Sequence, residues 1–168
     1  MITVRRDLKL DLIYPEDMSD KRYPCIVWIC GGGWIRMDKS AHLSYLSTLA
    51  HQGFVVCSVE YRTSNEGCYP MQIEDVKAAI RYLKAHADRY RIDKEHFGAM
   101  GESAGGFLTC MAALDHDKAR DVGEYLEESS SIQAACPWYP PTNLSTFKHK
   151  DAEECAALWS HFYSDIIL

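Results

Sequence analysis

Apolar and polar residues are arranged along this 168-residue chain in blocks of two kinds. Short apolar runs bounded by turn residues are typical of strands, and longer stretches with apolar residues at helical spacing are typical of helices. The runs predict strands at Leu8–Tyr14, Cys25–Cys30, Phe54–Val59, Phe97–Met100 and Ile132–Cys136. The spacing predicts helices at 40–51, 71–90, 104–114 and 152–163. Strands therefore alternate with helices.

This alternation, with strands rich in Val and Ile, favours an α/β fold with a mostly parallel sheet flanked by helices. Gly53 stands where a helix C-terminus is expected and Pro70 where a helix begins. Pro137, Pro140 and Pro141 predict a rigid loop after the fifth strand. Because the chain has no repeat, low-complexity segment or linker, we expect one domain over residues 1–168.

Composition narrows the class of protein. With 47% hydrophobic and 25% charged residues, the chain is typical of a globular domain. Its net charge of -6 includes no cluster of Lys and Arg, so we expect no nucleic-acid partner. No apolar stretch has the length of a signal peptide or a membrane span, which favours a cytoplasmic protein.

The cysteines and histidines indicate neither disulfides nor a metal centre. Seven cysteines are an odd count without a C-x-x-C pair, and Cys25, Cys30, Cys57 and Cys136 lie in apolar runs. We therefore expect buried, reduced thiols. The histidines lack the spacing of metal ligands, so we expect no metal and no cofactor.

The most informative string is Gly101-Glu102-Ser103-Ala104-Gly105, which follows an apolar strand and opens a helix. This G-x-S-x-G arrangement is typical of a nucleophile elbow, in which a sharp strand-to-helix turn presents the serine hydroxyl to a base. The helix that begins at Ala104 would direct free N–H groups and its positive dipole end at a developing oxyanion. Taken alone, the motif also fits a structural turn.

A second string, Gly31-Gly32-Gly33-Trp34, follows the strand Cys25–Cys30. Three glycines at the end of a strand leave backbone N–H groups uncovered, as an oxyanion hole requires. A flexible turn or a phosphate loop is the alternative, although neither phosphate-binding glycine motif is present. The two strings come in the order and structural context that acyl transfer requires.

With these motifs the sequence resembles the α/β-hydrolase esterases and lipases, in the group of hormone-sensitive lipase, bacterial acetyl esterases and feruloyl-type carbohydrate esterases. The resemblance covers most of the chain. Besides the two strings, it includes Glu60-Tyr61-Arg62, Tyr69-Pro70, the start of a long helix at Glu74–Ala79, and Cys136–Leu144.

The resemblance implies a serine hydrolase that acts on small carboxylic esters. Ser103 would attack the ester carbonyl, and the amides of Gly32, Gly33 and Ala104 would hold the oxyanion. Trp34, Trp138 and Tyr139 would line the substrate cleft, with core packing as an equally weighted alternative. Tyr61, Arg62 and Asp75 are expected to be scaffold. The sequence does not choose among acetylated sugars, feruloyl esters, short acyl lipids and small amides, and short-chain acyl esters are our default.

Two features depart from the family pattern. Cys30 stands where the family usually has a histidine before the three glycines. The triad acid and histidine usually follow later strands, but only 32 residues follow Cys136. His149, Asp151, His161 and Asp165 have the right chemistry without the expected placement.

We therefore interpret the chain as an incomplete α/β-hydrolase domain that lacks the last strands of the fold, with residues 145–168 as a cap or lid segment. We expect it to hydrolyse p-nitrophenyl acetate weakly or not at all, and a catalytically silent binding module is the alternative. An unpaired edge on the strand Ile132–Cys136 predicts a homo-oligomer. The apolar stripe of residues 152–168 would instead cover this edge if it folds back as a lid.

Overall fold

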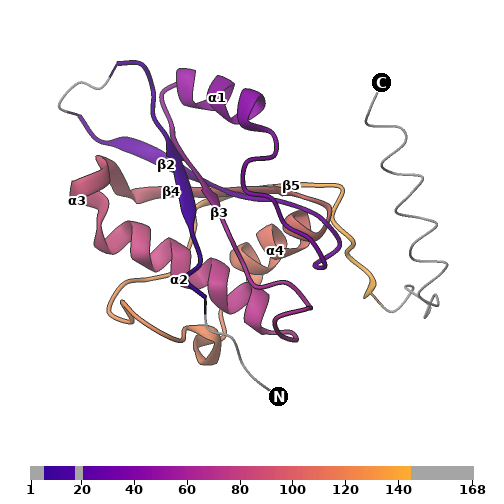
Figure 1. The fold of residues 1–168 in the computed structure, drawn as a ribbon. Coiled ribbons are helices and arrows are strands. Elements are labelled where there is room, and N and C mark those ends of the chain that lie inside the picture. The colour runs from indigo at the N-terminus through magenta and orange to yellow at the C-terminus, as the bar shows by residue number, and fades with distance from the viewer. Residues whose placement is uncertain (1–5, 18–20, 145–168) are drawn as a thin grey trace, which may run out of the picture.

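The computed structural model describes residues 6–17 and 21–144, which form a five-stranded sheet with helices on both faces (Figure 1). The strands are β1 (Leu10–Ile13), β2 (Tyr23–Ile29), β3 (Val55–Val59), β4 (Ile92–Glu102) and β5 (Ala134–Trp138). Their order is β1-β3-β2-β4-β5, and every neighbouring pair is parallel except β1 with β3. The predicted α/β class with a mostly parallel sheet is confirmed. The predicted helix at 152–163 lies outside the described residues.

Helix α1 (Leu43–His51) covers one face of the sheet, and α2 (Met71–Ala85) and α4 (Ser103–Leu114) cover the other (Figure 1). Alternate residues of β2 divide between these layers because successive side chains of a strand point to opposite faces. Ile26 and Trp28 pack with α1, whereas Val27 and Ile29 pack in the core that includes residues of α2 and α4. The central strands are thus buried on both sides.

Several element bounds differ from the sequence prediction. α1 begins at Leu43 rather than residue 40, because His42 has a left-handed backbone with φ 65° that a helix does not accept. The helix predicted over 71–90 is divided at His86 into α2 and α3 (Ala87–Tyr90). β4 begins at Ile92, five residues before the predicted start at Phe97. The pattern missed this part of the strand because Lys94, Glu95 and His96 are exposed, next to a register shift against β2.

The fifth strand corrects two predictions. Pro137 lies within β5, where it is aligned with Gly101 of β4, and not in the loop that follows. An edge strand accepts proline because one side of its backbone makes no ladder hydrogen bonds. Cys136 is exposed, not buried, because β5 pairs only with β4 among the described strands and has little cover.

Three basic side chains of α2 hold the segment between α4 and β5, which includes the short 3₁₀ helix η1 (Lys118–Arg120). Arg81, with a fully buried side chain, donates to the carbonyl oxygens of Val122 and Glu124 and to Asp121. Lys77 and Lys84 donate to the carbonyl oxygens of Asp117 and Ser131, at 3.0 and 2.7 Å. Their charges thus lie beneath the loop instead of in solvent.

Candidate active site

Strand β4 ends at Glu102 and helix α4 begins at Ser103, so the two elements meet without an intervening loop. Ser103 itself has φ 50°, in the left-handed region that residues with a side chain seldom adopt. Such strained positions cluster at active sites, where the surrounding structure holds them in place. The sharp strand-to-helix turn expected at Ser103 is therefore present.

Glycines allow the backbones around this turn to approach each other closely. A Cβ atom on Gly105 would lie 2.0 Å from the carbonyl oxygen of Ile29, and one on Gly101 would lie 2.6 Å from the carbonyl oxygen of Gly105. Any side chain at either position would collide with backbone. The first turn of α4 consequently packs directly on the end of β2.

The loop after β2 lies beside Ser103. A Cβ atom on Gly31 would lie 3.2 Å from Cβ of Ser103. Gly32 and Gly33 have φ values of 122° and 61°, and the Gly32 carbonyl accepts hydrogen bonds from two amides further along the loop. The amides of Gly32 and Gly33 donate no hydrogen bond to any described residue. The loop therefore brings backbone N–H groups that have no hydrogen-bond partner among the described residues close to Ser103.

Cys30 directly follows β2 and precedes the glycines. Burial raises the pKa of its thiol to about 11, so the thiol is a neutral group at physiological pH. The buried hydroxyl of Tyr61 donates to the Cys30 carbonyl oxygen at 2.9 Å. Asp75 accepts from both the guanidinium and the backbone amide of Arg62, at 2.7 and 2.8 Å. These contacts fix the strand ends next to the glycine loop.

The side chain of Glu102 connects the elbow to two other segments. Its Oε1 lies 2.9 Å from Nε2 of His42, the residue before α1. Its Oε2 accepts a hydrogen bond from the hydroxyl of Tyr139, the residue after β5. Partial burial and this bond to Glu102 raise the pKa of Tyr139 to about 12. The site therefore includes a carboxylate with both oxygens engaged.

The three predicted cleft aromatics differ in their surroundings. Trp34 packs edge-on against Phe107 of α4, with ring centroids 5.6 Å apart. Trp138 packs against the buried Trp28 at 5.3 Å and so belongs partly to the core. Tyr139 is 68% exposed. Trp34 and Trp138 thus make packing contacts, and Tyr139 projects from the surface beside Glu102.

The BD-FAE family model matches residues 10–162, nearly the whole chain. The chain belongs to the BD-FAE family. It is 33% identical over 132 residues to "Esterase LipC" of Mycobacterium tuberculosis, which covers 77% of this chain and 33% of that protein. It is also 33% identical over 109 residues to the "Acetyl esterase" of Salmonella typhi, covering 64% of this chain and 33% of that enzyme. The chain thus spans about a third of the length of these curated relatives.

Solved structures show the same architecture as this BD-FAE chain. The apo form of Thermogutta terrifontis esterase 2 superposes with a TM-score of 0.77 at 28% identity, covering 92% of this chain and 59% of that one. A bifunctional GH43-CE protein of Bacteroides eggerthii gives 0.76 at 31% identity, covering 89% and 21%. The family and the α/β-hydrolase esterase fold predicted from the sequence are confirmed.

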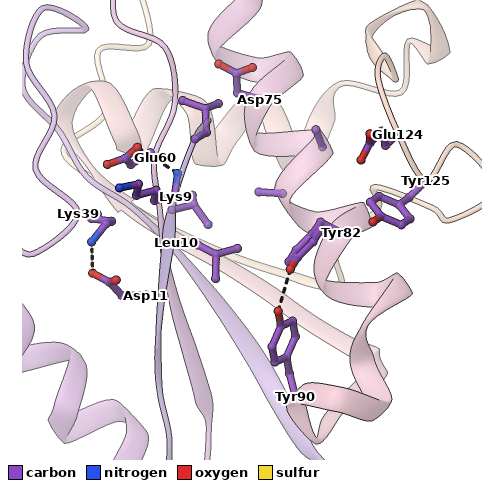
Figure 2. Close-up of a pocket in the computed structure, with 14 residues that line it drawn as sticks. Lys9, Leu10, Asp11, Lys39, Glu60, Asp75, Tyr82, Tyr90, Glu124 and Tyr125 are labelled. Atoms are coloured by element: carbon purple, nitrogen blue, oxygen red, sulfur yellow. Dashed lines mark hydrogen bonds and ion pairs between the residues drawn. The ribbon is translucent and has the colours of Figure 1, made fainter. Parts of the chain in front are cut away.

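The structure has a cavity of about 680 Å³, whose lining residues are drawn in Figure 2. It lies beside β1 and α2 and is lined by residues that include Leu10, Tyr82 and Tyr90. None of its lining residues belongs to the predicted catalytic or oxyanion set. The glycine loop and Ser103 of this BD-FAE chain therefore do not line this cavity. No helix in the described ranges is long and apolar enough to cross a membrane.

Sequence reasoning missed His42 and assigned no role to Glu102. Their contact joins residues 60 positions apart and depends on how α1 packs against the sheet, which no local pattern encodes. Glu102 stood inside the G-x-S-x-G motif, but at the one variable position between Gly101 and Ser103. His149, Asp151, His161 and Asp165 lie outside the described residues.

Proposed function

We propose that this BD-FAE chain belongs to a serine carboxylic ester hydrolase whose nucleophile is Ser103. The observation that supports the proposal best is the pairing of a left-handed Ser103 at the start of α4 with a glycine loop packed against it. Acyl transfer needs a serine that a sharp turn after a strand presents to the substrate, next to backbone amides that are free to bind an oxyanion.

In the proposed reaction, Ser103 Oγ attacks the ester carbonyl carbon, and its proton passes to a base. The carbonyl oxygen becomes an oxyanion, which accepts hydrogen bonds from the amides of Gly32, Gly33 and Ala104. The alcohol then leaves with a proton from the protonated base, and an acyl-enzyme remains. Water attacks this acyl group, releases the carboxylic acid and returns the proton to Ser103. Every group in this scheme comes from protein or water, so we propose no cofactor.

We place the histidine base and its carboxylate partner outside the described residues. Within residues 6–17 and 21–144, no histidine forms a hydrogen bond with the Ser103 hydroxyl. His42, the histidine bonded to the neighbouring Glu102, uses Nε2 for that contact. The described part therefore supplies the nucleophile and the oxyanion donors of the proposed mechanism.

We propose short-chain acyl or carbohydrate esters as substrates, with Trp34, Trp138 and Tyr139 beside the acyl group. An acetyl esterase is among the relatives, and Thermogutta terrifontis esterase 2 has been solved with propionate and butyrate bound. The named aromatics are bulky, and packing holds Trp34 and Trp138 in place. We propose that these rings leave little room beside Ser103. Long acyl chains would need space that these rings occupy.

The proposal is tested on the full-length protein, by which we mean a protein that contains this chain together with the triad histidine and acid. Its hydrolysis of p-nitrophenyl acetate, butyrate and octanoate is measured. We expect acetate and butyrate to exceed octanoate, and Ser103→Ala to lower kcat by at least about 10³-fold. Ser129→Ala, which removes an exposed hydroxyl far along the chain, is the matched control and should leave kcat unchanged. Turnover that survives Ser103→Ala would refute the proposal. Ester binding without turnover in the unaltered protein would indicate the silent binding module instead.

A further inference from the structure

Glu102 joins three segments that are distant in sequence. It is the last residue of β4, its partner His42 directly precedes α1, and its partner Tyr139 directly follows β5. Because each carboxylate oxygen has its own partner, the side chain is held from two sides. The Glu102 side chain is only 17% exposed, although its partners His42 and Tyr139 are 39% and 68% exposed.

Strained backbone is concentrated around this carboxylate. His42, Ser103 and Tyr139 have φ values of 65°, 50° and 35°, all in the left-handed region. Two of these residues bond to Glu102, and the third follows it in the chain. Left-handed backbone at residues with side chains persists only where surrounding contacts hold it. The Ser103 side chain forms no hydrogen bond to any described residue, so the nearest side-chain restraint on the elbow is that of Glu102.

Aromatic rings restrain the partners of Glu102. The His42 ring packs edge-on against Trp28, with centroids 5.5 Å apart, and Trp28 is fully buried. Trp28 in turn contacts Trp138, the neighbour of Tyr139, at 5.3 Å. Tyr45 of α1 also packs edge-on against Trp138, with ring centroids 5.0 Å apart. Both hydrogen-bond donors to Glu102 are therefore attached to one rigid aromatic cluster.

We propose that Glu102 is a positioning residue for the nucleophile. Its bonds to His42 and Tyr139 fix the end of β4, and through it the direction of Ser103 Oγ and of the Ala104 amide. This inference rests on the proposed function, because it assigns Glu102 a share in the reactivity of Ser103. A small displacement of a reacting group lowers the rate sharply while substrate binding is almost unchanged.

The first test compares Glu102→Ala with Glu102→Gln in the full-length protein. Alanine removes both acceptors, and we expect it to lower kcat by about 30- to 100-fold with KM changed less than about threefold. Glutamine keeps the size of the side chain, accepts from Tyr139 through its carbonyl oxygen and donates to His42 through its amide. We expect it to recover kcat to within about fivefold of the unaltered protein.

Glu66→Ala is the matched control. The Glu66 carboxylate also bonds to two partners, Arg6 and Thr63, but it lies in the loop between β3 and α2. We expect this variant to keep kcat while it loses as much stability in urea as Glu102→Ala. An equal loss of kcat in both variants would make the effect of Glu102 merely structural and overturn the inference.

A double-mutant cycle identifies the partner that transmits the effect. Tyr139→Phe removes the donor to Oε2 and keeps the ring. We expect the double variant Glu102→Ala, Tyr139→Phe to lose no more kcat than Glu102→Ala alone, because residues in one network are not additive. Fully additive losses would show that the two residues act separately, against the inference.

Crystal structures separate this inference from the proposed function. We expect Ser103 to leave the left-handed region, or to change its side-chain rotamer, in Glu102→Ala and to keep both in Glu102→Gln. If the unaltered protein lacks Ser103-dependent hydrolysis, the proposed function fails, and this geometric comparison still decides the positioning role. A Ser103 backbone and rotamer that are unchanged in Glu102→Ala would overturn that role.

Discussion

Gly31 lies directly against Ser103, such that a methyl group on Gly31 would be 3.2 Å from the Ser103 Cβ and 2.9 Å from the carbonyl oxygen of Glu102. The second distance is shorter than real Cβ contacts with backbone, and neither neighbour can rotate away. The elbow and the glycine loop are therefore fitted to each other at this point. The two segments can lie this close only because residue 31 has no Cβ atom.

Gly31→Ala should consequently force the two segments apart. We expect a loss of at least about tenfold in kcat and about 1–3 kcal/mol in the free energy of unfolding, as for overpacked sites. Gly98→Ala is the control within β4, because a Cβ atom there would meet its nearest neighbour at an ordinary 3.5 Å. Esterase assays and urea unfolding would check both variants, and equal behaviour would refute the close fit.

Arg81→Met should destabilise the protein more than the loss of any exposed ion pair. The Arg81 side chain is fully buried, and its removal leaves Asp121 and two carbonyl oxygens without this donor. We expect a cost of about 3 kcal/mol, measured by urea unfolding. Lys94→Met breaks an exposed pair with Glu128 and should cost less than about 1 kcal/mol. Similar costs would show that Arg81 is dispensable to the loop.

Buried and exposed cysteines should differ strongly in how readily an alkylating reagent modifies them. Burial raises the pKa of Cys57 well above its usual value and also raises that of Cys25, whereas Cys68 and Cys136 are exposed. The experiment uses the Cys155→Ser variant, in its native state at pH 8. We expect iodoacetamide to modify Cys68 and Cys136 in this variant and to spare Cys25 and Cys57. Mass spectrometry of peptides would read the pattern. Modification of Cys57 in native protein would contradict the packing of β3.

The free side of β5 should support self-association. Among the described strands, β5 pairs with β4 alone, and Ala134, Ala135 and Cys136 are exposed. Unpaired edges recruit further strands, so we expect the 168-residue chain to form oligomers in light scattering. Ala135→Lys should reduce them, because a charge on an edge strand opposes pairing. A monodisperse monomer with protected amides at 134–138 would mean that residues outside the described ranges cover this edge.

Sequence patterns predicted those parts of the fold whose signals are local. β3 was located to within one residue of its observed start because four of its five residues are apolar and all five are buried. The start of β4 was missed because Lys94, Glu95 and His96 are exposed within it. Cys136 was wrongly expected to be buried, because an apolar run does not reveal whether its strand lies at the centre of the sheet or at its edge.

The same distinction applies to the site. Ser103 and the Gly31–Gly33 loop belong to short motifs, so their placement beside each other could be anticipated. The bonds of Glu102 to His42 and Tyr139 span 60 and 37 positions. These bonds exist only once α1, β4 and β5 have packed, and no spacing in the sequence could have indicated them.

The anchoring of the loop over α2 has a consequence for how this protein can vary. Arg81, Lys77 and Lys84 reach the main-chain oxygens of the segment between α4 and β5, at Val122, Glu124, Asp117 and Ser131. A carbonyl oxygen is present whatever side chain the residue carries. Substitutions at most positions of this loop should therefore leave its path unchanged. Asp121 is the exception, because its side chain supplies the charge opposite Lys77 and Arg81.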